Sequence, residues 1–127
     1  MLISLPWPRA ELSPNARVHH FVKARAKKAY RTGCGWEAMQ AFAEAGRPKF
    51  LPPAKLSITF HPPDNRRRDM DNMLAAIKSG LDGVADAIGM DDRHWTLSLS
   101  VGPVVARGRV VIAIDAAQAI EVRGVVS

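Results

Sequence analysis

The segment Asn72–Ile88 repeats apolar residues at the spacing of one face of an α-helix, and this pattern constrains the fold more than any other. The segments on either side of it, Lys55–His61 and Trp95–Val101, alternate apolar and polar residues as β-strands do. Gly89 follows the last apolar position, where many helices end with a left-handed residue. The sequence therefore predicts an amphipathic helix between two strands, with its apolar face packed on a sheet.

Further elements extend this pattern on both sides. Met1–Pro6 alternates and ends in prolines, as an edge strand would. Val18–Ala45 is rich in helix-forming residues, but Thr32–Gly35 interrupts it, so the stretch is either two helices or one helix with a weak point. Arg109–Asp115 alternates again, and we expect it to form a hairpin with Trp95–Val101.

The resulting order β-α-β-α-β-β predicts one α+β domain over residues 1–127, a small mixed β-sheet with helices packed on it. The composition, 47% hydrophobic and 24% charged, is that of an ordinary soluble protein and excludes a disordered or collagen-like chain. No apolar run is long enough to span a membrane, and the first eleven residues lack a basic leader, so we expect no membrane partner and no signal peptide. The single cysteine, Cys34, fits a reducing cytoplasm.

The acidic residues are concentrated in one part of a basic chain. The net charge is +6, yet residues 69–92 hold six of the twelve acids and only one basic residue, Lys78. A basic protein attracts polyanions such as nucleic acid or anionic lipid. The local excess of carboxylates is therefore either a divalent cation site or a set of solvated helix-face and cap residues.

The segment from His61 to Asn72, HPPDNRRRDMDN, joins three arginines to two carboxylates. If the backbone stays extended through Arg68–Met70, Asp69 and Asp71 point to the same side, and they repel unless a proton or a cation lies between them. Such oxygen ligands favour Mg²⁺, with Mn²⁺ as a substitute, over zinc. The alternative is that one of the two carboxylates caps the following helix.

Two more carboxylates, Asp91 and Asp92, follow the helix. The helix is about 25 Å long at 1.5 Å per residue, so these acids reach the first pair only if the chain folds back near Trp95. Carboxylates that meet beside three arginines would form a metal-dependent phosphodiesterase site, in which the metal polarises a phosphoryl oxygen and arginine holds phosphate. If they do not meet, Asp91 and Asp92 form a turn and the arginines a solvated loop.

The arrangement His61-x-Pro63-Asp64-x-Arg66-Arg67-Arg68-Asp69-x-Asp71-Asn72, with the following helix and Asp91-Asp92, resembles the RusA-like Holliday-junction resolvases. Leu5-Pro-Trp-Pro8, Ser13-Pro14-Asn15 and Lys28-Ala-Tyr30-Arg31 are similar to the phage and prophage form of that family. This resemblance covers nearly the whole chain. It implies a Mg²⁺-dependent endodeoxyribonuclease that acts as a homodimer on four-way DNA junctions in recombination and repair, in the cytoplasm of a bacterial host.

The resemblance also assigns roles to particular residues. The catalytic and metal-binding positions carry over to Asp69, Asp71 and Asp92, with Asp91 as an adjacent metal ligand. The family commonly has a lysine where this chain has Ala75. Lys78, one turn further along the same helix face, or the arginines before the helix would take over its role.

Other basic residues are expected to bind DNA through phosphate contacts, which give affinity without reading sequence. They are Arg17, Lys23, Lys27, Lys28, Arg31, Arg66, Arg67 and Arg68. Trp7 and Trp36 either stack on bases at the junction or pack in a core or an interface. Two other functions stay open: a non-catalytic DNA-binding module with the same fold, and a small phosphohydrolase that uses the metal site on nucleotides.

Overall fold

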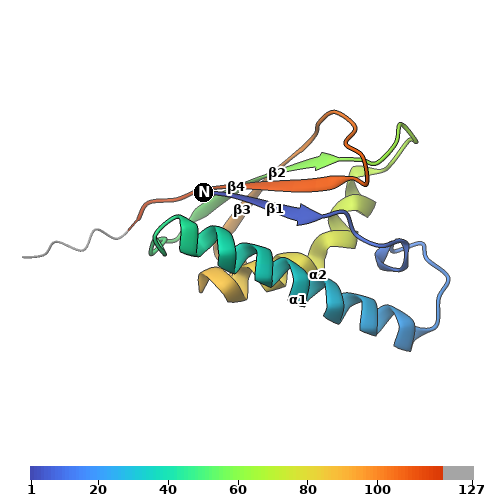
Figure 1. The fold of residues 1–127 in the computed structure, drawn as a ribbon, viewed down its shortest axis with the longest axis horizontal. Coiled ribbons are helices and arrows are strands. Elements are labelled where there is room, and N and C mark those ends of the chain that lie inside the picture. Colours follow the sequence, from blue (N-terminus) through green and yellow to red (C-terminus); the bar gives the residue numbers. More distant parts are fainter. Residues whose placement is uncertain (119–127) are drawn as a thin grey trace, which may run out of the picture.

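One four-stranded sheet with two helices on one side of it makes up the computed structural model, which describes residues 1–118 (Figure 1). In chain order the elements are β1 (Leu2–Pro6), η1 (Ala10–Leu12), α1 (His20–Glu44), β2 (Ala54–His61), α2 (Met70–Ile88), η2 (Asp92–His94), β3 (Trp95–Val101) and β4 (Arg109–Asp115). The two η elements are single 3₁₀ turns. This order confirms the predicted α+β class with a small mixed sheet. Neither helix in this part of the chain is long and apolar enough to cross a lipid bilayer.

The strand order is β1-β4-β2-β3, so β4 lies inside the sheet and is antiparallel to both of its neighbours. β3 is parallel to β2 and forms an edge, with Leu97 opposite Leu56. The predicted hairpin between β3 and β4 is therefore wrong. Alternation identifies strands but not their partners: β4 buries three side chains and takes a central position, whereas no side chain of β3 is fully buried.

α1 is one uninterrupted helix, because Thr32–Gly35 forms a close contact with α2 rather than a break. A Cβ on Gly83 of α2 would collide with the carbonyl oxygen of Arg31. A Cβ on Gly35 would in turn lie 3.3 Å from the carbonyl oxygen of Gly83. Glycine at these two positions therefore lets the two helix backbones touch.

α2 begins at Met70, two residues before the predicted start, and ends before Gly89, whose φ of 70° is left-handed as expected. Its apolar face and the helix-facing side of the sheet form the hydrophobic core. The largest fully buried side chains are Ile3, Leu5, Leu56, Ile58, Phe60, Ile77, Val84, Val110 and Ile112. Because α2 joins the parallel strands β2 and β3, it runs back along the sheet. The two acidic segments that the sequence analysis identified as candidate sites therefore lie at its two ends.

Candidate active site

Asp69 is the N-cap of α2. Its backbone is extended (φ −83°, ψ 130°), and its carboxylate accepts a hydrogen bond from the backbone N–H of Asp71 at 2.9 Å. An extended backbone through Arg68–Met70 is therefore not observed, because Met70 is already helical. Asp69 has the capping role that the sequence left open, and Asp71 lies next to it in the first turn.

A groove of about 390 Å³ lies between α2 and β3. Asp71, Lys78 and Asp82 reach it from one face of α2, because they are seven and four residues apart. Asp92 reaches it from η2, so the chain does fold back after the helix. We call this the acidic groove; it is lined by Asp71, Leu74, Ala75, Lys78, Leu81, Asp82, Asp92, Trp95 and Leu97.

The predicted acids lie at opposite ends of the acidic groove. Asp71 and Asp82 are eleven residues apart, so they are separated by about 16 Å along the helix axis. Asp92 lies at the Asp82 end, where both also line a hollow with Gly89. Within residues 1–118, no three His, Cys, Asp or Glu side chains gather closely enough to hold a metal ion. One chain thus places Asp69 and Asp71 at the same end of α2 and leaves Asp92 apart.

Asp82 is a half-buried residue of the acidic groove that sequence reasoning missed. The signal was present in the spacing: Asp82 follows Lys78 by four residues and Asp71 by eleven, and both intervals return to the same helix face. Lys78 lies between the two carboxylates, on the face predicted for it.

Asp91 does not line the acidic groove. Its carboxylate caps η2 by accepting a hydrogen bond from the backbone N–H of Arg93 at 3.0 Å. That hydrogen bond, with the Arg93 guanidinium 3.3 Å away, lowers the pKa of Asp91. Asp91 faces the neighbouring hollow with Arg31 and Asp86, so its position matches the alternative interpretation, a turn.

The three arginines before α2 are not equivalent. Asp64 accepts hydrogen bonds from the backbone N–H of Arg66 at 2.9 Å and from Nη1 of Arg68 at 2.8 Å, and Nε of Arg66 lies 3.3 Å from it. The hydrogen bond from Arg68 is the largest cause that holds the pKa of Asp64 well below its usual range. Arg67 has no ion-pair partner in the described part of the chain. Of the three, Arg67 is the most available to an external anion.

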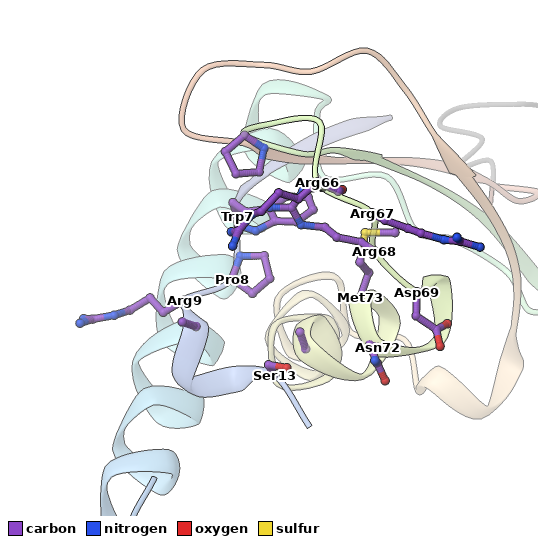
Figure 2. Close-up of a pocket in the computed structure, with 13 residues that line it drawn as sticks. Trp7, Pro8, Arg9, Ser13, Arg66, Arg67, Arg68, Asp69, Asn72 and Met73 are labelled. Atoms are coloured by element: carbon purple, nitrogen blue, oxygen red, sulfur yellow. Dashed lines mark hydrogen bonds between the residues drawn. The ribbon is translucent and has the colours of Figure 1, made fainter. Parts of the chain in front are cut away.

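A second pocket, of about 510 Å³, lies on the other side of the first turns of α2 (Figure 2). The loop before α2 and the segment after β1 form its walls, and Arg9 and Arg67 point away from each other across it. We call it the basic pocket; it is lined by Trp7, Pro8, Arg9, Ala10, Ser13, Pro63, Arg66, Arg67, Arg68, Asp69, Asn72, Met73 and Ala76. α2 therefore separates a mainly basic pocket from the acidic groove, with Asp69 on the basic side and Asp71 on the acidic side.

The basic residues on and before α1 that were predicted to bind DNA fall into two groups. Some are held by a hydrogen bond or an ion pair within the fold, and the others, called open here, have no ion pair in the described residues. Nη2 of Arg31 lies 2.6 Å from Oδ2 of Asp86, and Lys23 donates to the carbonyl oxygen of Ser13 at 3.2 Å. The remaining three are exposed and have no ion pair among residues 1–118: Arg17, Lys27 and Lys28. The two open lysines lie on α1, where they can contact a phosphate backbone.

No protein-family model matches the chain. The chain is similar to an uncharacterized protein of Xylella fastidiosa (strain Temecula1 / ATCC 700964), with 41% identity over 100 residues. The alignment covers 73% of this chain and 61% of that relative, so the chain spans less than two thirds of the relative's length. The relative's description assigns no activity, and the functional argument therefore depends on the chemistry of the groove and the pocket.

Proposed function

We propose that this chain is a Mg²⁺-dependent endodeoxyribonuclease of the RusA-like type, which resolves four-way DNA junctions by paired nicks during recombination and repair in a bacterial cell or its prophage. The observation that carries the proposal is the acidic groove, where Asp71, Lys78 and Asp92 open into one space, with the arginine loop on the other side of the first turns of α2. This combination of oxygen ligands and cations suits the hydrolysis of a phosphodiester.

A homodimer would bring together the acids that lie apart within one chain. A two-fold axis through the middle of the acidic groove would exchange its ends, because each surface in such an interface contacts its symmetric counterpart. Asp92 of the partner subunit would then approach Asp69 and Asp71. The same axis would create two identical sites, which a two-fold symmetric junction requires for paired nicks.

The properties of the edge strand β3 support the proposal that a second copy of the chain covers this face. The outer edge of β3 has no strand partner among residues 1–118, and its seven residues include no charge that would discourage pairing. Leu97, which lines the groove, is 38% exposed, and Val101 on the same strand is 56% exposed. Covering these side chains with a second β3 would bury apolar surface and continue the sheet into the partner.

The carboxylate ligands fit Mg²⁺ when those of two subunits are considered together. Asp71 from one subunit and Asp92 from the other would hold the ion, with the negative charge of Asp69 close by at the start of α2, and neither Asp71 nor Asp92 is engaged in an ion pair within residues 1–118. When bound, Mg²⁺ supplies a Lewis acid for the phosphoryl oxygen and lowers the pKa of water. Lys78 neutralises charge that develops on the phosphate, and Arg67 holds the adjacent backbone.

The test combines junction cleavage with subunit mixing. Synthetic four-way junctions and a linear duplex of matched sequence are incubated with the wild-type chain in Mg²⁺, Mn²⁺ or EDTA. We expect paired nicks in the junction only, and only with metal. Asp71→Asn and Asp92→Asn should each be inactive alone, whereas refolded mixtures of the two should recover nicking, because mixed dimers contain one complete site. Mixtures that stay inactive while wild type cuts would contradict a shared site.

One observation favours the second candidate, a non-catalytic DNA-binding module: a single chain gathers no three metal-ligating side chains within residues 1–118. Junction binding that persists in EDTA, without cleavage in any metal, would support this module. Turnover of free nucleotides with intact junctions would instead support a small phosphohydrolase.

A further inference from the structure

We propose that Arg68 is a positioning residue that fixes the metal-binding end of α2 and does not contact DNA, an inference that rests on the proposed nuclease function. Arg68 and Arg67 are adjacent, and the sequence predicts the same phosphate-binding role for both. Their surroundings differ. The side chain of Arg68 is only 17% exposed, whereas Arg67 is exposed and has no ion-pair partner in the described residues.

The guanidinium of Arg68 is held by three acceptors of its own loop. Nη1 donates to the carboxylate of Asp64 at 2.8 Å, to the carbonyl oxygen of Asp64 at 3.3 Å and to that of Arg66 at 3.2 Å. These contacts close the loop between β2 and α2 on itself. A phosphate could bind Nη1 of Arg68 only by displacing them, and the side chain is largely buried, so Arg68 is a poorer candidate for a DNA contact than the exposed Arg67.

The other side of Arg68 rests on an aromatic ring that the fold itself immobilises. The guanidinium carbon lies 5.5 Å from the centroid of Trp7, within the range of a cation–π interaction. Trp7 meets Phe60 edge to face, with centroids 6.4 Å apart. A Cβ on Gly108 would lie 2.7 Å from Cγ of Trp7, so the backbone of Gly108 packs directly against the indole. Trp7 is therefore a fixed support from the core, which Figure 2 shows beside Arg66 and Arg68.

Arg68 connects this support to the residue that follows it. Asp69 must hold its extended cap conformation for its carboxylate to reach the N–H of Asp71. With Trp7 on one side and Asp64 on the other, Arg68 fixes the backbone just before that cap. Residues that orient metal ligands in this way change metal affinity or rate.

The experiment compares three variants of the full chain: Arg68→Lys, the charge-conserving pair Asp64→Asn/Arg68→Gln, and Arg67→Gln. Junction Kd is measured against salt concentration in Ca²⁺, and single-turnover cleavage is measured against Mg²⁺ at saturating protein. We expect the first two variants to lose about 10-fold to 100-fold in rate or in Mg²⁺ affinity, as supporting residues do. Their salt dependence should match wild type. Arg67→Gln should weaken binding and lower the slope of log Kd against log salt by about one.

A second readout does not depend on cleavage. The backbone N–H of Asp71 should exchange with solvent faster in Arg68→Lys than in wild type, at an unchanged melting temperature and with unchanged exchange in β2. If Asp64→Asn/Arg68→Gln lowers the salt slope as Arg67→Gln does, Arg68 is a DNA contact and the inference is overturned. If wild type never cuts, the proposed function fails, yet unchanged Asp71 exchange in Arg68→Lys would still overturn the positioning role by itself.

Discussion

The carboxylate of Asp69 caps the helix that carries Asp71, through a hydrogen bond of 2.9 Å to the Asp71 backbone N–H. One acid of the pair thus sets the position of the other. The two side chains also face different surfaces, since Asp69 lines the basic pocket and Asp71 lines the acidic groove. This relationship separates a structural effect of Asp69 from a chemical effect of Asp71, and mutations can test each one.

Asp71→Asn should abolish junction cleavage and leave junction binding intact. The substitution removes a ligand charge but keeps the size and the helical position of the side chain, so we expect a rate loss of at least about 100-fold. Gel-shift titration in Ca²⁺ and cleavage in Mg²⁺ measure the two properties. Asp115→Asn, at an exposed carboxylate on β4, is the matched control. Loss of binding together with cleavage would indicate a folding role for Asp71.

Asp69→Ala should destabilise the protein by about 1 kcal/mol, because the cap of α2 is lost. Asn is as good a cap as Asp, so Asp69→Asn should retain most of the stability while losing the negative charge that the metal needs. Denaturant unfolding measures the first effect and cleavage the second. Equal stability losses in both variants would show that the capping hydrogen bond contributes little.

Gly83→Ala should destabilise the fold by about 1–3 kcal/mol, as overpacking does, because the new Cβ meets the backbone oxygen of Arg31 and α1 has to move. Gly33→Ala is a matched control in the facing helix: nothing lies within 4 Å of its Cβ position. That change should stabilise the helix by about 0.5–1 kcal/mol. The free energies of unfolding from urea titrations should therefore change in opposite directions.

The ion pair of Asp64 should make stability depend on acid pH. Because the pKa of Asp64 is lowered in the folded state, chiefly by Arg68, the folded protein binds fewer protons there than the unfolded chain. This contribution is complete above the ordinary carboxyl pKa of about 4 and is lost as the pH falls towards the lowered folded value. In Asp64→Asn, stability should fall less steeply between pH 4 and pH 2 than in wild type. Parallel curves would contradict the assignment.

Cys34 should resist thiol reagents in the native protein. Its side chain is fully buried at the contact between α1 and α2, and burial raises the pKa of the thiol to about 12. At pH 8 the thiol therefore stays protonated and shielded, and a disulfide reagent such as DTNB should react only after unfolding in guanidinium. Rapid modification of the folded protein would show that the two helices separate readily.

Local sequence patterns were sufficient to predict an element where neighbouring residues determine its structure. The spacing within Asn72–Ile88 predicted α2, and Gly89 predicted its end, because periodicity and a left-handed cap are properties of one segment. Pairing between strands depends on distant residues, so alternation in β3 and β4 could not show that β4 inserts between β1 and β2. Thr32–Gly35 was ambiguous for the same reason: Gly35 packs against Gly83, about fifty residues away.

The same contrast between local patterns and long-range contacts applies to the candidate site. The spacing of Asp71 and Lys78 placed them on one face, and the chain folds back so that Asp92 lines the groove, a reversal that the sequence left open. Sequence could not show that Asp92 stops at the far end, because that depends on where the parallel β3 joins β2. Nor could it distinguish Arg67 from Arg68, since the difference arises from Asp64 and Trp7.

The touching backbones at Gly35 and Gly83 have a mechanical consequence. Helices separated by bulky side chains can slide by repacking them, but a glycine contact leaves no layer that could adjust. The lysines of α1 and the carboxylates of α2 are therefore parts of one rigid body with a constant spacing. Any ligand that bridges them must itself bend or rotate to match that spacing, and the protein contributes a fixed template.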